Sequence, residues 1–331
     1  MELLGLSIAM IAVFVGFGLL IGILFGFFGM GGSFLVTPAL LVMGYPAKVA
    51  VGSGLAFVFG TSVIGALKHR DHGQVDYKLA ALMTVGMTAG IEVGKRVVFL
   101  LEELGSADLV VSVAYVGLLA IVGLFTLRDA RSERDESGAR TFADHVQAVR
   151  LPPTVTLADD GRVSVWIVLA VGGAIGVLSG FLGVGGGFLL MPAMMYGLGV
   201  PATVAVGTDI LQITVSGAYG AFVYAQAGSV ALPVVGSLLA GSALGARIGA
   251  SATKLVDEDA IKGYFAAMLL AGSLSVGAKE LGTSLDLAAL TALSVVLIFG
   301  ATVLVSTVIV LAAVCSLRRE TSGRWCRLVS S

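Results

Sequence analysis

Long uncharged stretches dominate the chain and limit how its helices can be arranged. Residues 3–47 form 45 consecutive uncharged positions, and the runs 163–208, 210–246 and 287–317 contain 46, 37 and 31. A helix needs about 20 apolar residues to cross a bilayer, so the two longest runs must each hold more than one segment. The pattern predicts helices over 6–28, 33–44, 47–67, 78–100, 108–127, 164–181, 187–199, 203–223, 229–250, 260–278 and 287–316.

Two glycine clusters interrupt the longest runs at similar places. They lie in "FGFFGMGGSFLVTP" (25–38) and in "SGFLGVGGGFLLMP" (179–192). Glycine is a poor helix former, and a bilayer offers no hydrogen-bonding partner to a broken backbone. Broken helices at membrane depth are therefore expected only where they line a cavity or are buried in protein.

The clusters belong to an internal duplication. "YPAKVAVGS" (45–53) matches "VPATVAVGT" (200–208) at an offset of 155, and "AGIEVGKR" (89–96) matches "AGSALGAR" (240–247) at 151. Three blocks in the same order indicate two structural repeats rather than a solenoid. Six residues of the first cluster match six of the second at an offset of 154. The first set is Gly26, Gly29, Gly31, Gly32, Phe34 and Pro38, and the second is Gly180, Gly183, Gly185, Gly186, Phe188 and Pro192.

The loop charges indicate that the repeats are inverted. Loop 68–78 holds three basic residues and is expected in the cytoplasm, whereas its counterpart 224–229 holds none and is expected outside. This places the N-terminus outside and the C-terminus inside. The predicted fold is an all-α polytopic membrane protein with two inverted repeats, about seven full crossings and one broken or re-entrant helix pair in each half.

Composition supports a membrane protein. The 331 residues are 57% hydrophobic and 12% charged, about half the charged share of a soluble domain. The expected organisation is a first repeat over 1–127, a charged cytoplasmic linker over 128–163, a second repeat over 164–316 and an Arg-rich cytoplasmic tail over 317–331. We expect a multi-pass protein of the cytoplasmic membrane. No basic patch suggests a nucleic-acid partner, and neither a cofactor nor a metal is expected.

In the predicted topology both short helices begin just after a glycine cluster and point their N-termini toward the bilayer centre. Helix N-termini attract anions through unpaired N–H groups and a partial positive charge. The alternative role for glycines spaced four apart is close helix packing, which we favour for Gly18, Gly22, Gly26, Gly90, Gly94, Gly241 and Gly245. Candidate anion-binding residues are Gly29, Gly31, Gly32, Ser33, Phe34, Gly183, Gly185, Gly186, Gly187 and Phe188.

The motifs "GFFGMGG…TP…YPAKVAVGS" and "GFLGVGGG…MP…VPATVAVGT" resemble the two repeats of the TauE/SafE sulfite exporter family. The matching blocks cover most of the chain outside the linker and the tail. The resemblance implies a secondary carrier of sulfite, thiosulfate, sulfonates or related carboxylates, and it leaves the particular anion open. The first repeat has Ser33 where the second has Gly187, so the two halves need not contact a substrate equally.

A few polar residues interrupt the apolar segments and have two interpretations each. Ser53 and Thr208 are equivalent and either donate to an oxyanion or make helix–helix hydrogen bonds. Asp209 is the one acid between 163 and 246, and it either carries a coupling proton or reaches water at the inner interface. Gln212 lies one turn further along the same face.

Arg96 and Arg247 are also equivalent. Either could bind an anion, but we favour structural or topogenic roles, with Glu92 pairing to Arg96 and Arg247 reaching the cytoplasmic face. A metal site at His69, Asp71 and His72 has too few ligands to be convincing.

Transport by alternating access explains the breaks better than other functions do. A channel is the alternative within transport, although no charged ring or filter repeat is seen. A membrane enzyme would need a nucleophile–base pair or a metal cluster, which the sequence lacks. The partners expected are a small anion and the lipid bilayer, with a proton as the candidate coupling ion, and the oligomeric state is left open.

Overall fold

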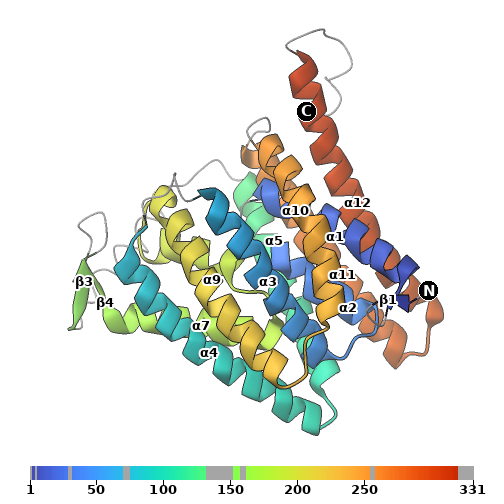
Figure 1. The fold of residues 1–331 in the computed structure, drawn as a ribbon, viewed down its shortest axis with the longest axis horizontal. Coiled ribbons are helices and arrows are strands. Elements are labelled where there is room, and N and C mark those ends of the chain that lie inside the picture. Colours follow the sequence, from blue (N-terminus) through green and yellow to red (C-terminus); the bar gives the residue numbers. More distant parts are fainter. Residues whose placement is uncertain are drawn as a thin grey trace. The chain divides into compact units, whose positions relative to one another are not determined.

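A computed structural model describes residues 2–3, 6–28, 32–69, 75–131, 152–156, 162–253 and 258–319 (Figure 1). The described part of the chain is almost entirely helical. In the first half its elements are β1 (Glu2–Leu3), β2 (Leu6–Ser7), α1 (Ile8–Phe28), the 3₁₀ segment η1 (Gly32–Leu35), α2 (Val36–Val42), α3 (Ala47–His69), α4 (Tyr77–Glu103) and α5 (Ala107–Arg131).

The second half repeats this order after a short β-hairpin. Its elements are β3 (Thr154–Thr156), β4 (Arg162–Ser164), α7 (Val165–Leu182), α8 (Gly187–Pro192), the π-helical segment η2 (Ala193–Gly197), α9 (Ala202–Gln226), α10 (Leu232–Ala252), α11 (Glu258–Ser284) and α12 (Ala288–Arg319).

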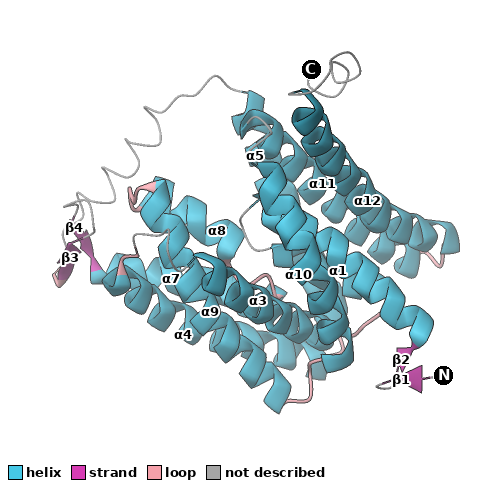
Figure 2. Ribbon diagram, turned by 45° about the horizontal axis from the view of Figure 1, so that its top comes forward, coloured by secondary structure: helices cyan, strands magenta, loops and turns pink. Residues whose placement is uncertain are grey.

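The helices begin and end close to the expected positions, but the linker differs in two ways. Helix α5 continues to Arg131, past the expected end at 127, and β3 pairs antiparallel with β4 inside the expected linker (Figure 2). A helix with no Pro or Gly at its end simply extends into water. Residues 132–151, between α5 and β3, lie outside the described part.

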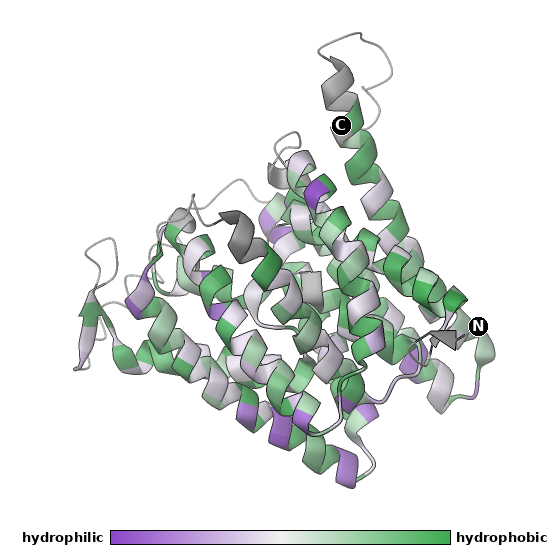
Figure 3. Cartoon of the chain, viewed as in Figure 1, coloured by the Kyte–Doolittle hydropathy of each residue, from purple (hydrophilic) through white to green (hydrophobic). Residues whose placement is uncertain are grey.

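Seven of the described helices are long and apolar enough to cross a membrane: α1, α3, α5, α7, α10, α11 and α12. The two helices α1 and α7, expected as the first arms of re-entrant pairs, are therefore long enough to span by themselves. By contrast, α4 and α9, with 27 and 25 residues, are long enough to cross a membrane but are not among the helices that are also apolar enough. Figure 3 shows hydrophilic positions toward the C-terminal end of α4.

The chain forms two compact units that do not follow its two halves. Unit 1 comprises residues 1–45, 108–133 and 232–331, and unit 2 comprises 46–107 and 134–231. Unit 1 thus contains α1, α2 and α5 together with α10, α11 and α12. Unit 2 contains α3 and α4 together with α7, α8 and α9. Each unit therefore combines helices from both repeats.

In unit 1, glycines bring the backbones of α1 and α10 together. A Cβ atom at Gly18, Gly22 or Gly26 would overlap the main chain of residues 238, 242 and 246, respectively. In return, Gly241, Gly245 and Gly249 meet the main chain of α1. The contacts advance in the same direction on both helices, which therefore run parallel.

Unit 2 contains the equivalent pair, α4 with α7. Gly86, Gly90 and Gly94 of α4 pack against the α7 backbone, and Gly172, Gly176 and Gly180 of α7 pack against that of α4. At the repeat offset of 154, the α7 glycines match those of α1. The packing role favoured for the glycines spaced four apart is confirmed, because their neighbours are main-chain atoms.

Two further pairs place equivalent helices of the two repeats side by side. In unit 2, Gly220 of α9 faces Leu55 of α3, whereas the earlier Gly217 faces the later Phe59. In unit 1, Gly272 of α11 faces Leu119 of α5, and Gly277 faces the earlier Val116. Both pairs are antiparallel. Equivalent helices running in opposite directions are the geometry of inverted repeats.

Replacing Gly245 of α10 with alanine should destabilise unit 1. The added Cβ would lie within 3 Å of main-chain atoms of Leu19 and Ile23, which cannot rotate away. We expect the free energy of unfolding to fall by about 1–3 kcal/mol, the usual cost of overpacking. Thermal unfolding of the purified protein in detergent measures the change.

Gly236→Ala provides the matched control in the same helix, because no heavy atom lies within 4 Å of its added Cβ. This variant should unfold at or above the wild-type temperature, since alanine favours a helix. Equal losses in the two variants would contradict a role for backbone contact.

Candidate substrate site

The second-half glycine break is fully described and lies within unit 2. Helix α7 ends at Leu182, and its C-cap Gly183 adopts a left-handed conformation with φ of 75°. The Gly183 N–H donates to the carbonyl of Ser179 at 2.7 Å. Gly185 and Gly186 also have positive φ values, 68° and 84°. Three left-handed residues within four positions explain why this segment requires glycine.

Side chains from three helices enclose this loop. A Cβ atom at Gly185 would meet the side chain of Val58 from α3. At Gly186 it would lie 2.8 Å from Met87 Cε of α4 and 3.0 Å from Ile175 Cγ2 of α7. Residues 182–188 are all buried. The break therefore lies inside protein, as expected of irregular backbone in a membrane protein.

Helix α8, which follows the break, is shorter than expected. It contains only Gly187–Pro192 and continues as the π-helical segment η2, in place of one helix over 187–199. Pro192 lacks an N–H group, which accounts for the change in hydrogen bonding at this point. A helix this short has a weaker dipole than a longer one. Unpaired N–H groups at its start would therefore attract an anion more than the dipole would.

The first-half break is only partly described, and it belongs to unit 1. The predicted site residues Gly29 and Gly31 lie outside the described residues, as do the side-chain surroundings of Gly32 and Ser33. Gly32 begins η1 rather than an α-helix, and α2 follows from Val36. Phe34 is buried and packs edge-on against Phe265, with ring centroids 5.3 Å apart. Phe188, its counterpart in unit 2, is equally buried.

Ser53 and Thr208 make equivalent hydrogen bonds between helices of unit 2. Ser53 Oγ accepts from the backbone N–H of Ala231 at 3.0 Å, and Thr208 Oγ1 accepts from that of Asp76 at 3.1 Å. Ala231 and Asp76 are themselves 155 positions apart, the offset of the repeat. The structure therefore contains the helix–helix hydrogen bonds that were one of the two interpretations, and substrate binding by these hydroxyls stays a prediction.

Asp209 and Gln212 are buried in α9, with exposed fractions of 5% and 0%. Asp209 Oδ1 and Gln212 Oε1 have no hydrogen-bond partner, and neither does the buried Oγ of Ser179. Gln212 Nε2 donates to the thioether of Met87. The alternative interpretation of Asp209 was that its side chain reaches water at the inner interface. Its small exposed fraction does not agree with that interpretation. Because unsatisfied buried polar atoms are rare in folded proteins, these three oxygens point to a ligand or water.

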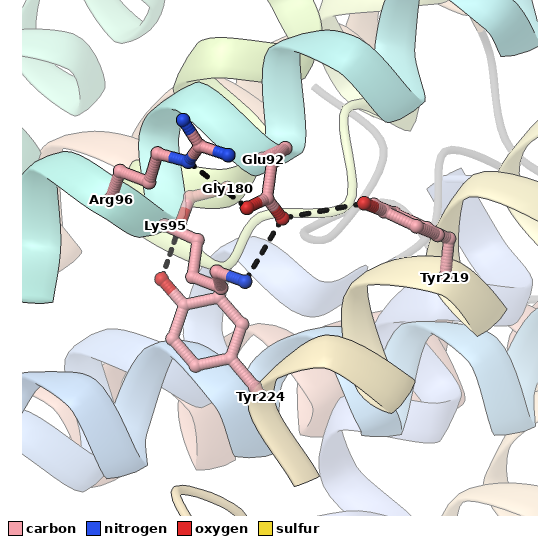
Figure 4. A network of polar contacts seen from close by, with 6 residues as sticks. All are labelled: Glu92, Lys95, Arg96, Gly180, Tyr219 and Tyr224. Carbon is pink, nitrogen blue, oxygen red and sulfur yellow. Dashed lines mark hydrogen bonds and ion pairs between the residues drawn. The ribbon is translucent and has the colours of Figure 1, made fainter. Parts of the chain in front are cut away.

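A polar cluster surrounds Glu92 of α4 (Figure 4). The carboxylate of Glu92 is 2.9 Å from Lys95 Nζ and 3.1 Å from Arg96 Nε, and Tyr219 Oη of α9 donates to it at 3.3 Å. The expected Glu92–Arg96 ion pair is thus present. Nearby, Tyr224 donates to the carbonyl of Gly180 at 2.6 Å, which links α9 to α7.

Arg96 and Arg247 both lie on exposed helix faces. The Arg96 side chain is 76% exposed, and Arg247 of α10 is exposed as well. Neither arginine is among the buried polar residues near a glycine break. Arg96 pairs with Glu92, and the structural or topogenic role of Arg247 stays a prediction, as does anion binding by either arginine.

Sequence reasoning missed Met87, Ser179 and Tyr219. Each lies in an apolar run without a repeated counterpart, so no pattern distinguishes it from a packing residue. Asp71 and His72, which we considered and rejected as metal ligands, lie outside the described residues, as does the side chain of His69. Within the described part of the chain, no group of three potential ligands is found.

These features define a polytopic α-helical membrane protein with two inverted repeats and a glycine cluster in each half. The chain belongs to the sulfite exporter TauE/SafE family, whose model matches residues 14–276. Because the family consists of membrane transporters, the chain is a multi-pass membrane transporter that acts on a small substrate.

Two relatives that are 26–27% identical to the chain agree with this assignment. The chain is 27% identical over 246 residues to a probable membrane transporter protein of Xylella fastidiosa (strain 9a5c), covering 74% of this chain and 85% of the relative. It is 26% identical over 266 residues to the probable membrane transporter protein YjnA of Bacillus subtilis (strain 168), covering 78% and 96%. No solved structure matches the chain.

Thr208→Val should lower the stability of unit 2. Valine has nearly the same shape but removes the acceptor of the Asp76 N–H group at the start of α4. We expect the free energy of unfolding to fall by about 1–3 kcal/mol, the cost of an unsatisfied buried group. Thermal unfolding in detergent measures this, and Thr208→Ser, which keeps the hydroxyl, should unfold like the wild type. A stable valine variant would contradict the structural importance of this bond.

Proposed function

We propose that this protein is a secondary carrier of a small sulfur-containing or organic oxyanion, such as sulfite, thiosulfate or a sulfonate. The observation that carries the proposal is the buried glycine break of unit 2, where three residues in the left-handed conformation place irregular backbone inside the protein. A membrane protein gains nothing in stability from such a break, whereas an anion-binding protein gains backbone donors. The family and the relatives support transport of a small solute.

Backbone donors suit a carrier because they bind an anion without a buried cation. Gly185 and Gly186 carry no side chain, and the space beside them is filled by Val58, Met87 and Ile175. An anion would reach their main chain once these side chains move aside. No basic residue lies in helix α7 or in the break itself, between Val165 and Pro192. An anion held by neutral donors is bound weakly enough to be released on the other side of the membrane. The equivalent residues of unit 1, Gly29, Gly31, Gly32 and Ser33, are proposed to act in the same way.

We place the coupling proton on Asp209. Its carboxyl group is buried, one oxygen has no hydrogen-bond partner, and no cation pairs with it in the described residues. Burial without a partner strongly favours the neutral form of a carboxyl group. A carboxyl that is protonated when buried and ionised when exposed to water carries one proton across in each cycle, as alternating access requires.

Counterflow in proteoliposomes tests the function directly. Vesicles loaded with unlabelled sulfite, thiosulfate or a sulfonate should accumulate the same labelled anion from outside, and protein-free vesicles should not. A carboxylate such as acetate distinguishes a carrier of organic acids. The proposal would be wrong if the vesicles accumulated none of these anions, or accumulated cations instead. Flux that lacks counterflow and does not saturate would favour a channel.

Asp209→Asn tests the coupling. Asparagine cannot release a proton, so we expect anion exchange to continue while uptake no longer responds to a pH gradient. Initial rates with and without the gradient provide the measurement. Asp286→Asn, in the exposed turn between α11 and α12, is the control and should behave like the wild type. An undiminished response in Asp209→Asn would exclude this residue as the proton carrier.

A further inference from the structure

One side chain of unit 2 connects the glycine break to a buried amide. Met87 of α4 reaches Gly186, where its Cε atom would lie 2.8 Å from an added Cβ. The Sδ atom of the same side chain accepts from Nε2 of Gln212 in α9. The amide of Gln212 is thus separated from the break by a single methionine side chain.

The hydrogen bonding of Gln212 is unusually incomplete. The side chain is 0% exposed, its Oε1 atom has no partner, and its only acceptor is a thioether, which is a weak one. Several other buried hydroxyl groups avoid this cost by bonding to a carbonyl one turn back, as Thr61, Ser216 and Thr302 do. A leucine would fill the space of Gln212 more cheaply, so packing alone does not account for an amide here.

Met87 is suited to give way. Methionine is unbranched and fits irregular spaces, so its side chain can move without displacing a helix. Its departure would open the space beside Gly186 and free the N–H group of the Gln212 amide that the thioether accepts. An anion that entered there would gain a side-chain donor in addition to the backbone.

The groups around Gln212 provide no competing cation. On its own helix, Asp209 lies one turn earlier, and Tyr219 lies two turns later. On α4, Glu92 and its partners Lys95 and Arg96 lie more than a turn beyond Met87, with the acid paired to both bases. Helix α7 has no charged residue, and neither does α3 between Val49 and Leu67. Hydrogen-bond donors, rather than a fixed positive charge, are therefore what an anion would meet at this position.

We propose that Gln212 recognises the transported anion directly, its amide moving from the Met87 thioether to an oxygen of the substrate as Met87 swings away from Gly186. The inference rests on the proposed function and identifies the substrate class as an oxyanion with at least two acceptor oxygens on one central atom. Sulfite, thiosulfate and a carboxylate share this chemistry.

Anion binding to the purified protein tests the inference separately from transport. Sulfite, thiosulfate and acetate are each titrated into the protein in detergent, and the rise in unfolding temperature gives an apparent Kd. For Gln212→Leu we expect the Kd of the preferred anion to be about tenfold weaker or more, as for loss of one hydrogen bond to a charged group. Met87→Leu should bind more tightly than the wild type, because it removes the competing acceptor.

Gln212→Glu adds a readout that a merely structural role would not produce. When ionised, the introduced carboxylate repels an anion, and when neutral it again offers a donor. Relative to the wild type at the same pH, this variant should bind poorly at neutral pH and recover as the pH falls. Gln226→Glu, the same change at the exposed end of α9, should match the wild type throughout.

Unchanged binding in Gln212→Leu, or no binding of any of these anions to the wild type, would overturn the inference. A wild-type protein that binds an anion through Gln212 but fails in the counterflow assay would instead overturn the proposed transport and leave the binding site standing. The recovery of Gln212→Glu at low pH also shows that this variant is folded.

Discussion

Contact between helix backbones is the interaction on which this fold depends. In a bilayer, apolar side chains gain nothing by leaving lipid, so helices associate through close packing and hydrogen bonds. The α1–α10 and α4–α7 pairs meet this requirement along their length, because each helix presents a glycine at every turn of the contact. Neither pair could form with larger residues at these positions.

These pairs also determine what can surround the glycine break. Because α4 packs so closely on α7, Met87 reaches the loop that follows α7 and meets Gln212 on the other side. The same helix presents Glu92 to Tyr219 further along. Helix α4 therefore contacts both the helix that leads into the break and the helix that carries the buried polar residues. It is a natural route by which events at the break could affect α9.

The sequence was sufficient for the helices and their duplication, but less so for how they pack. Uncharged runs place the ends of the long helices within a few residues, except at α5 and α11, which continue to Arg131 and Ser284 instead of ending at 127 and 278. The β3–β4 hairpin has too few residues to produce a recognisable alternation. The change from α-helix to π-helix after Pro192 depends on local hydrogen bonding, which the hydrophobic periodicity of a sequence does not predict. For the site, repetition drew attention to Ser53 and Thr208, and isolation to Asp209. The Met87–Gln212 contact joins residues 125 positions apart and has no sequence signal.

The hydrogen bonds of Ser53 and Thr208 have a consequence for the history of the chain. Each joins a helix of one repeat to a backbone amide of the other, and the close-packed pairs likewise take one helix from each repeat. A polypeptide containing only one repeat would lack the partners for all of these contacts. It could complete them only by assembling with a second copy inserted into the membrane the opposite way up. The interlocking of the repeats is thus what an ancestral dimer of oppositely oriented subunits would leave behind once its two genes were joined.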